Sequence, residues 1–350
     1  MQNALVIPEK GAQFTLATRP IPTPGPREVL VKVRAVALNP VDWWNQKRSY
    51  LINEFPAVIG WDIAGEVIAL GEGVSRYVVG DKVIGQGLPY PDYGGFQEYA
   101  LLGEDFSAKV PAITTYEQAS TIPSALAAAF VMLYAPVPRG LGLQPVIPSG
   151  QGAYANQPIL ILGGASSVGQ YTIQLAKASG FSPIITTASL KHTEKLKALG
   201  ATHIIDRNIP INTIRPQISE IIGIALGASA DTNDGLLSYI FDTVSVQETQ
   251  TAAYDLLAPG GTLALVLPPL VQSSPEKRVT GSMATPLVPE AREDLKVLYA
   301  SITTLVENGT IEPSKVEVLP GGLAGIADGV KRLEEYKVSG VKLVAQPSTQ

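Results

Sequence analysis

The chain has 350 residues, of which 45% are hydrophobic and 16% charged, enough apolar sequence for one large or two ordinary domains and too much for an intrinsically disordered protein. Its net charge of -5 argues against nucleic acid or an anionic membrane as the main partner. The sequence has no cysteine, which excludes disulfides, thiolate catalysis and cysteine-ligated zinc, and only His192 and His203 supply imidazole.

Membrane insertion and secretion are not indicated. No stretch approaches the roughly 20 apolar residues of a membrane-spanning helix. Residues 1–8 carry no basic segment and no long apolar run, so they do not resemble a secretory signal. We therefore expect a cytoplasmic protein without a membrane partner.

The first part of the chain predicts short strands separated by turns. Residues 28–36 follow a loop rich in proline and glycine, and three more apolar runs, bounded by glycine-containing turns, lie at 65–71, 78–85 and 94–101. Many short strands with turn residues between them indicate a small β-rich, barrel-like unit.

A helical pattern follows this unit. Thr114 is the predicted N-cap of a helix with Glu117 at its third position, and residues 124–134 predict an alanine-rich helix. Residues 136–157 are rich in Pro, Gly, Gln and Ser and predict a surface loop.

Strands and helices alternate from residue 159 onward, which predicts an α/β fold with a doubly wound parallel sheet. Strands are expected at 159–162, 183–187, 203–205, 239–242 and 262–267, and helices at 168–179, 193–199, within 216–226, and at 247–257. A polar connection at 273–289 then leads to a helix at 290–307, a strand at 316–319, a helix near 323–336 and a last strand at 341–345.

The first of these strand–helix units predicts a phosphate-binding turn. The apolar run 159–162 suits a strand buried on both faces, and small residues follow it in the pattern Gly163-x-x-Ser166-x-x-Gly169. Such a turn lets a ligand approach the backbone and presents the free N–H groups of a helix start to an anion. An ordinary strand–turn–helix without a ligand is the alternative.

The same turn approaches the G-x-S-x-G pattern of a hydrolase nucleophile elbow. Val168 stands where that pattern needs its last glycine, and no histidine follows His203 to complete a triad. We therefore interpret the turn as a dinucleotide site rather than a hydrolase site.

The end of the second predicted strand favours NADPH over NADH. NAD enzymes place a carboxylate there to bind the adenine ribose, whereas NADP enzymes use basic and hydroxyl residues for the 2′-phosphate. Here Ser189 and Lys191 offer donors and no carboxylate is present. Arg207, after the third strand, is a second cation for the phosphate or for stacking on adenine. A solvated helix-start residue is the alternative role of Lys191.

Five segments of the chain together form a family pattern: Asn39–Trp43, Pro56–Gly65, Val79–Val83, Gly163–Gly169 and Lys337–Val344. On these motifs the chain resembles the medium-chain dehydrogenase/reductase superfamily, in its zinc-free quinone and enoyl reductase branch. It is similar to fungal enoyl reductases, including those that act in trans with polyketide synthases.

The resemblance implies a GroES-like catalytic domain built from both ends of the chain and a Rossmann domain between them. We place the first part of the catalytic domain at 1–125, the Rossmann NADPH-binding domain at 126–272 and the return to the catalytic domain at 273–350. The cofactor would lie between the two domains.

The resemblance also implies a set of cofactor-binding residues. Asn39 would bind the cofactor, and Asp42 would either lie near the nicotinamide ribose or have a structural role. The other implied residues are Gly163, Ser166, Ser167, Val168 and Gly169 in the turn, Val244 near the ribose, Leu267 near the ring, and Val338 and Ser339 on the returning segment.

Zinc members of this superfamily carry a cysteine and a Gly-His-Glu motif that this chain lacks. Asp62 stands at the place of the glutamate, and Asp62 and Asp42 alone cannot hold zinc tetrahedrally. We therefore expect no metal.

Three aromatic residues are candidates for the substrate side. Trp43 and Trp44 would line an apolar slot, or pack in the core of the first domain. Tyr50 lies near the segment where related enoyl reductases carry a catalytic tyrosine, with a structural tyrosine as the alternative.

The leading hypothesis is a zinc-independent, NADPH-dependent reductase of activated C=C bonds in enones or enoyl thioesters, in secondary-metabolite biosynthesis. An NADPH quinone reductase is the alternative enzyme, and a cofactor-binding sensor or structural protein is the alternative outside enzymes. A small-molecule substrate is expected, with a polyketide synthase as candidate partner and a monomer or a homodimer as the assembly.

Overall fold

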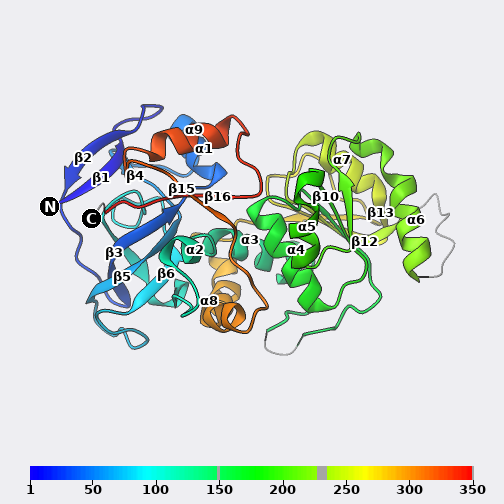
Figure 1. The fold of residues 1–350 in the computed structure, drawn as a ribbon, viewed down its shortest axis with the longest axis horizontal. Helices are drawn as coiled ribbons and strands as arrows, with labels where there is room; N and C mark the ends of the chain where they lie inside the picture. The colour runs from blue at the N-terminus through cyan, green and yellow to red at the C-terminus, as the bar shows by residue number, and fades with distance from the viewer. Residues whose placement is uncertain (148–149, 227–234, 349–350) are drawn as a thin grey trace.

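The computed structural model describes residues 1–147, 150–226 and 235–348, which fold into two units lying side by side (Figure 1). The first unit combines the N-terminal part of the chain, blue to cyan, with the C-terminal part, orange to red. The second unit is the green and yellow middle of the chain. The predicted α/β class with a β-rich unit and a parallel-sheet unit is therefore confirmed.

The β-rich unit contains two sheets. The smaller sheet has the order β2-β1-β4, and the larger has the order β15-β16-β3-β5-β6-β8, with β7 paired to β3. Pairing of Val344 with Ala37 brings the end of the chain onto the central strand β3. The bounds are β1 Gln2–Ile7, β2 Thr15–Arg19, β3 Glu28–Ala37, β4 Ala57–Val58, β5 Asp62–Leu70, β6 Lys82–Gln86, β7 Tyr99–Gly103, β8 Ser107–Lys109, β15 Val316–Val318 and β16 Lys342–Ala345.

The second unit is built on a parallel sheet with the order β11-β10-β9-β12-β13-β14. Every residue of β9 is buried, as expected for a strand covered on both faces. The order reverses between β9 and its neighbour β12, which is where ligands bind in doubly wound sheets. The bounds are β9 Ile159–Leu162, β10 Ile184–Ala188, β11 His203–Asp206, β12 Leu237–Asp242, β13 Leu257–Leu265 and β14 Arg278–Gly281.

Helix α3 joins the two units. Every residue of α3 except Ser124 and Ala128 is buried, and the helix packs against α4 and α8 in one apolar cluster. A helix that is apolar all round is suited to this internal position. The helices are α1 Pro40–Arg48, α2 Tyr116–Ser120, α3 Pro123–Tyr134, α4 Ser167–Ser179, α5 Thr193–Leu199, α6 Arg215–Leu226, α7 Gln247–Leu256, α8 Arg292–Glu307 and α9 Ile326–Glu334.

The structure corrects three sequence predictions. The N-cap of α2 is Thr115 with Gln118 at the third position, one residue after the predicted pair Thr114 and Glu117. Helix α1 was not predicted. The polar connection predicted at 273–289 contains strand β14, whose pairing with β13 carries the parallel sheet past residue 272.

Candidate functional site

The turn after β9 is held in place by close backbone packing. A Cβ on Gly164 would lie 2.1 Å from Thr186 Oγ1, and a Cβ on Gly169 would lie 2.4 Å from the Gly163 carbonyl oxygen. Gly163 itself has a φ of 80°. The glycines therefore allow α4 to begin directly against the carboxyl end of β9.

Ser166 replaces the middle glycine of a dinucleotide fingerprint and caps helix α4. Its Oγ accepts a hydrogen bond from Gly169 N–H at 2.9 Å and lies 3.0 Å from Thr243 Oγ1. Across the described residues, no protein group accepts from the N–H groups of Ser167 and Val168. These two donors fit an anionic group at the helix N-terminus, as the phosphate-binding prediction requires.

A second turn, after β12, lies against the glycine turn. Thr243 Oγ1 donates to the carbonyl oxygen of Leu162 at 2.7 Å, and a Cβ on Gly163 would meet Val244 Cγ2 at 2.7 Å. The buried carboxylate of Asp242 accepts from the Val244 N–H at 2.9 Å. Burial raises the pKa of Asp242, although the hydrogen bonds lower it. Val244 is 39% exposed beside the turn.

Ser189, Lys191 and Arg207 come together at the ends of β10 and β11. Ser189 begins a short 3-10 helix, Leu190–His192, and Lys191 is exposed on it. The Arg207 N–H donates to the Ala188 carbonyl oxygen at 2.9 Å, which fixes Arg207 beside the end of β10, and its side chain is exposed. This grouping of one hydroxyl and two cations fits a phosphate.

The returning segment, which carries Val338 and Ser339, contacts His192 beside this group. Ser339 Oγ lies 2.9 Å from His192 Nε2, in the same 3-10 helix as Lys191. Val338 packs against the core of the β-rich unit. Leu267 is half-buried just after β13. Contacts of these residues with a nicotinamide remain predictions.

Asn39 and Asp62 belong to a buried polar cluster in the β-rich unit. Asn39 Nδ2 donates to Asp62 Oδ2 at 2.8 Å, and Lys342 Nζ lies 2.5 Å from Asn39 Oδ1 and 3.2 Å from Asp62 Oδ2. Asp62 Oδ1 accepts from the Ser124 N–H at 2.6 Å, at the start of α3. The cluster joins strands β5 and β16 to both helices that begin nearby, α1 and α3.

Asp42 lies beneath this cluster and is fully buried. Its Oδ2 accepts from the Asn39 N–H at 2.7 Å, whereas its Oδ1 has no hydrogen-bond partner. Burial raises the pKa of Asp42 to about 8, against the lowering effects of the Asn39 hydrogen bond and Lys342. This position favours the structural role that the sequence left open for Asp42.

Three aromatic rings follow one another along α1 and the turn after it. Trp43 and Trp44 meet edge to face at 5.5 Å, and Trp44 meets Tyr50 in the same way at 5.6 Å. The guanidinium of Arg48 lies 5.5 Å from the Trp43 ring centre. Tyr50 is 45% exposed, while Trp43 packs partly against the core.

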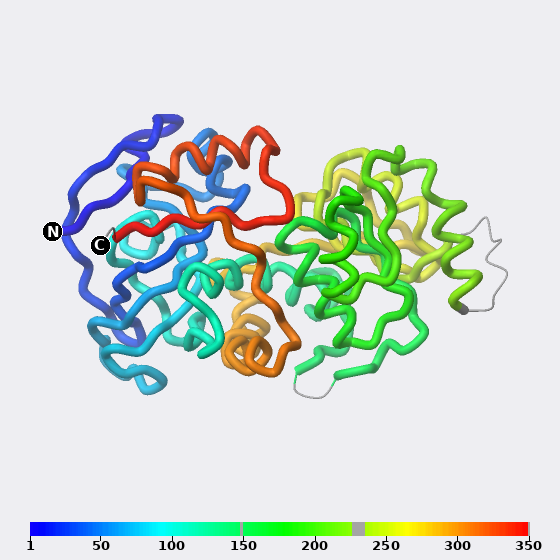
Figure 2. Tube along the Cα trace, viewed as in Figure 1, coloured from blue at the N-terminus to red at the C-terminus, as the bar shows by residue number. Residues whose placement is uncertain are grey.

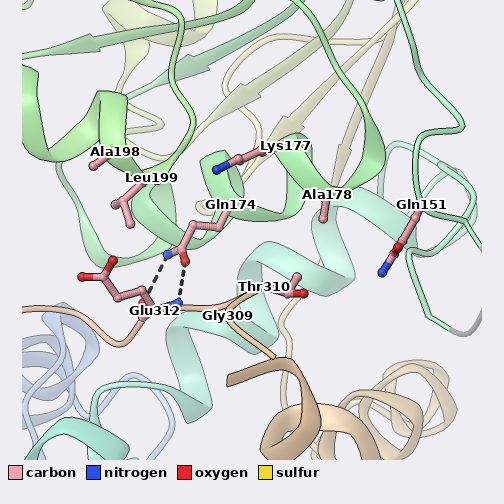
Figure 3. Close-up of a pocket in the computed structure, with 9 residues that line it drawn as sticks. All are labelled: Gln151, Gln174, Lys177, Ala178, Ala198, Leu199, Gly309, Thr310 and Glu312. Carbon is pink, nitrogen blue, oxygen red and sulfur yellow. Dashed lines mark hydrogen bonds between the residues drawn. The ribbon is translucent and has the colours of Figure 1, made fainter. Parts of the chain in front are cut away.

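A pocket of about 300 Å³ lies away from these groups, at the carboxyl end of α4 (Figure 3). The side-chain amide of Gln174 exchanges two hydrogen bonds with the backbone of Glu312 on its wall, and Lys177 lies nearby. The glycine turn is at the opposite end of the same helix. This pocket is therefore not the predicted cofactor site.

Sequence reasoning missed three residues of these groups. Thr243 is adjacent to the predicted residue Val244, and His192 is adjacent to Lys191. Lys342 lies in the motif Lys337–Val344, which carries the family resemblance. Over the described ranges, no three His, Cys, Asp or Glu side chains are grouped to hold a metal ion. Likewise, none of the described helices combines the length and apolar character needed to cross a membrane.

Two family models match the chain. Residues 25–112 match the alcohol dehydrogenase GroES-like domain, and residues 167–270 match the zinc-binding dehydrogenase family. The trans-enoyl reductase tazE of Aspergillus terreus is 36% identical over 215 residues, which cover 58% of this chain and 68% of tazE. The chain belongs to the medium-chain dehydrogenase/reductase superfamily.

Further relatives and solved structures agree with this assignment. The dehydrogenase azaJ of Aspergillus niger is 36% identical over 224 residues, and the match spans 62% of this chain and 63% of azaJ, less than two thirds of that relative. A putative zinc-dependent alcohol dehydrogenase from Rhizobium etli has a TM-score of 0.81 at 24% identity, over 100% of this chain and 99% of the other.

The mycobacterial protein Rv1454c complexed with NADPH has a TM-score of 0.77 at 23% identity, over 99% of this chain and 100% of that one. These structural matches establish the fold. As a superfamily member, the chain combines a GroES-like unit and a Rossmann unit.

Proposed function

We propose that this protein is a zinc-independent, NADPH-dependent reductase of activated C=C bonds in enones or enoyl thioesters. The observation that carries the proposal is the grouping of Ser189, Lys191 and Arg207 at the strand end where NAD enzymes place a carboxylate. The relative tazE, a trans-enoyl reductase, supports the substrate class.

The cofactor site would be built from both turns of the parallel sheet. The free N–H groups of Ser167 and Val168 would bind the pyrophosphate, and Ser166 and Thr243 would line the adjacent ribose. Lys191 and Arg207 would hold the 2′-phosphate. When bound, NADPH would supply a hydride to an electrophilic carbon.

The contacts of Asp62 support a reaction without zinc. Both of its carboxylate oxygens are engaged, one by the Ser124 N–H and the other by Asn39 and Lys342. Asp62 stands where zinc enzymes carry the glutamate, and the ammonium group of Lys342 lies against its carboxylate. A metal there would have to displace Lys342, which is 4% exposed.

The substrate side would be formed by the aromatic group on α1. Trp43 and Trp44 offer apolar ring surface, and the hydroxyl of the partly exposed Tyr50 is the candidate donor of a proton. The protein would act chiefly by holding the acceptor carbon in place and excluding water, because an activated acceptor needs little further polarisation.

A steady-state assay tests the proposal. Oxidation of NADPH is followed with an enone, an enoyl thioester and a quinone as acceptors, with NADH as alternative cofactor and with and without a chelator. Turnover of the enone or thioester with NADPH and no effect of the chelator is expected. Turnover of the quinone alone would make the protein a quinone reductase, and tight NADPH binding without any turnover would favour a sensor.

The cofactor preference has its own test. Lys191→Ala should weaken NADPH binding by about tenfold, equivalent to about 1.4 kcal/mol, and leave NADH binding unchanged. Lys197→Ala, an exposed lysine on the following helix α5, is the matched control and should change neither. An equal effect of Lys191→Ala on both cofactors would remove Lys191 from the phosphate site.

The wider biological setting is part of the same proposal. A trans-acting role would require a polyketide synthase that presents an enoyl thioester, so turnover on a carrier-bound acceptor should exceed turnover on the free thioester. The domain division at residues 125 and 272, with β14 added to the Rossmann unit, and a monomeric or homodimeric assembly also belong to the proposal.

A further inference from the structure

His192 stands where the two units of the molecule touch. Its Nε2 lies 2.9 Å from Ser339 Oγ, and a Cβ on Gly340 would lie 2.4 Å from His192 Cε1, so the returning segment lies directly against the imidazole. In Figure 2 the red segment after α9 extends toward the green middle of the chain before it turns back into β16. Ser339 and His192 are 147 residues apart in sequence.

Two cations lie near the imidazole of His192. Burial lowers the pKa of His192, and the cations of Lys191 and Arg207 lower it further. The nearby carboxylate of Asp206, at the end of β11, accepts from the Asn208 N–H at 3.0 Å. Across the described residues no carboxylate lies within ion-pair distance of His192, and its hydrogen-bonding partner is the hydroxyl of Ser339.

The segment that carries Ser339 also reaches the buried polar cluster of the β-rich unit. Lys342 follows Ser339 closely on the same segment, and its ammonium group contacts Asn39 and Asp62. A short stretch of chain therefore connects the 3-10 helix at the end of β10 to the buried side chains of Asn39 and Asp62.

We propose that His192 is a positioning residue that takes up a proton when the 2′-phosphate of the cofactor binds and, through Ser339, holds the two units together in that state. The inference rests on the proposed NADPH site. A phosphate dianion between Lys191 and Arg207 would offset their repulsion of an imidazolium and attract it directly. An imidazolium Nε2–H donates to the Ser339 hydroxyl as a charge-assisted hydrogen bond, which is stronger than the neutral one.

NADH lacks this phosphate and would leave the two cations unopposed. Protonation of His192 would then remain unfavourable near neutral pH. His192 would thus distinguish the two cofactors without itself reaching the reacting atoms, because only the phosphorylated cofactor would strengthen the contact between the units.

NMR titration of the imidazole signals provides a direct test, since the chain has only two histidines. The variant His203→Gln assigns the His192 signal, and the pKa of His192 is measured for the free protein and with saturating NADPH or NADH. We expect NADPH to raise the pKa of His192 by about one unit and NADH to leave it unchanged. Cofactor binding is followed separately by nicotinamide fluorescence.

The affinities give a second readout. A shift of one unit requires NADPH to bind about tenfold more tightly to the protonated form. Its affinity should therefore fall by up to that factor as the pH rises from below the pKa of His192 in the free protein, which lies below 6.5, to above its pKa in the NADPH complex. His192→Gln should reduce this fall, as it keeps a donor for Ser339 but cannot take up a proton. His203→Gln should retain the fall, and Ser339→Ala should weaken NADPH binding more than NADH binding.

The outcomes separate the two proposals. If NADPH binds but the pKa of His192 stays unchanged, or shifts equally with NADH, the role of His192 is refuted and the reductase proposal stands. If NADPH does not bind, the reductase proposal fails and the inference fails with it.

Discussion

Replacement of Lys342 tests the buried cluster most directly. Its side chain is 5% exposed and that of Asp62 is fully buried, with 3.2 Å between Lys342 Nζ and Asp62 Oδ2. Lys342→Met keeps the length of the side chain and removes the charge. The carboxylate of Asp62 then remains buried without its cation, and the Asn39 side-chain oxygen loses its donor.

The expected loss follows from this burial. Removing one partner of a buried ion pair typically costs about 3–5 kcal/mol, most of it from the uncompensated charge. At an m-value of about 2 kcal/mol per M, a loss of 4 kcal/mol lowers the urea midpoint by about 2 M. The three tryptophans, at positions 43, 44 and 61, all lie in the β-rich unit, so their fluorescence reports the unfolding of that unit.

Two controls make the result decisive. Lys337→Met removes a lysine of the same segment whose ion pair with Glu335 is exposed, and it should cost less than about 1 kcal/mol. The double variant Asp62→Asn/Lys342→Met removes the unpaired charge and should recover part of the loss. A loss below about 1 kcal/mol for Lys342→Met, or strict additivity in the double variant, would refute the assignment of a stabilising buried pair.

Three further predictions follow from the candidate site. Gly164→Ala should lower stability by about 1–3 kcal/mol in thermal unfolding and weaken cofactor binding, because its Cβ would lie 2.1 Å from Thr186 Oγ1. The control Gly103→Ala should be neutral, since its Cβ would meet no atom nearer than 3.5 Å, and equal effects of the two variants would contradict the packing argument. Since burial raises the pKa of Asp42 to about 8, the stability that its protonated carboxyl contributes is present below pH 4 and is lost as the pH rises toward 8. Asp42→Asn should therefore reduce the fall in the free energy of unfolding with pH by up to about 1.4 kcal/mol per pH unit, measured by urea unfolding at several pH values. An unchanged dependence on pH would contradict this prediction. Tyr50→Phe should keep turnover within about threefold if the ring only packs; a loss of 100-fold or more would assign it the proton transfer.

The local features of the parallel sheet could be predicted from the sequence. The apolar run of β9, the small residues after it and the capping serine of α4 are encoded within a few consecutive residues, so their pattern identifies them directly. The polar residues Ser189 and Lys191 come directly after β10, so their position follows from the predicted end of that strand. The α/β class and the two-unit organisation were predicted for this reason.

Elements with weak local patterns were missed. Helix α1 carries two adjacent tryptophans with no clear apolar stripe, and β14 is a four-residue strand with a polar sequence. Strand β14 forms because it pairs with β13. The local sequence of β14 does not show that this partner lies beside it.

Composition and short-range spacing are enough to show which residue types are available for a phosphate and to exclude cysteine chemistry. The folded chain, and not the sequence pattern, shows that Ser339 reaches His192 and that Lys342 reaches Asn39 across 303 residues. Such contacts depend on strand pairing and on the packing of the two units. The same folding buries Asp42, and burial, rather than residue type, raises the pKa of its carboxyl group.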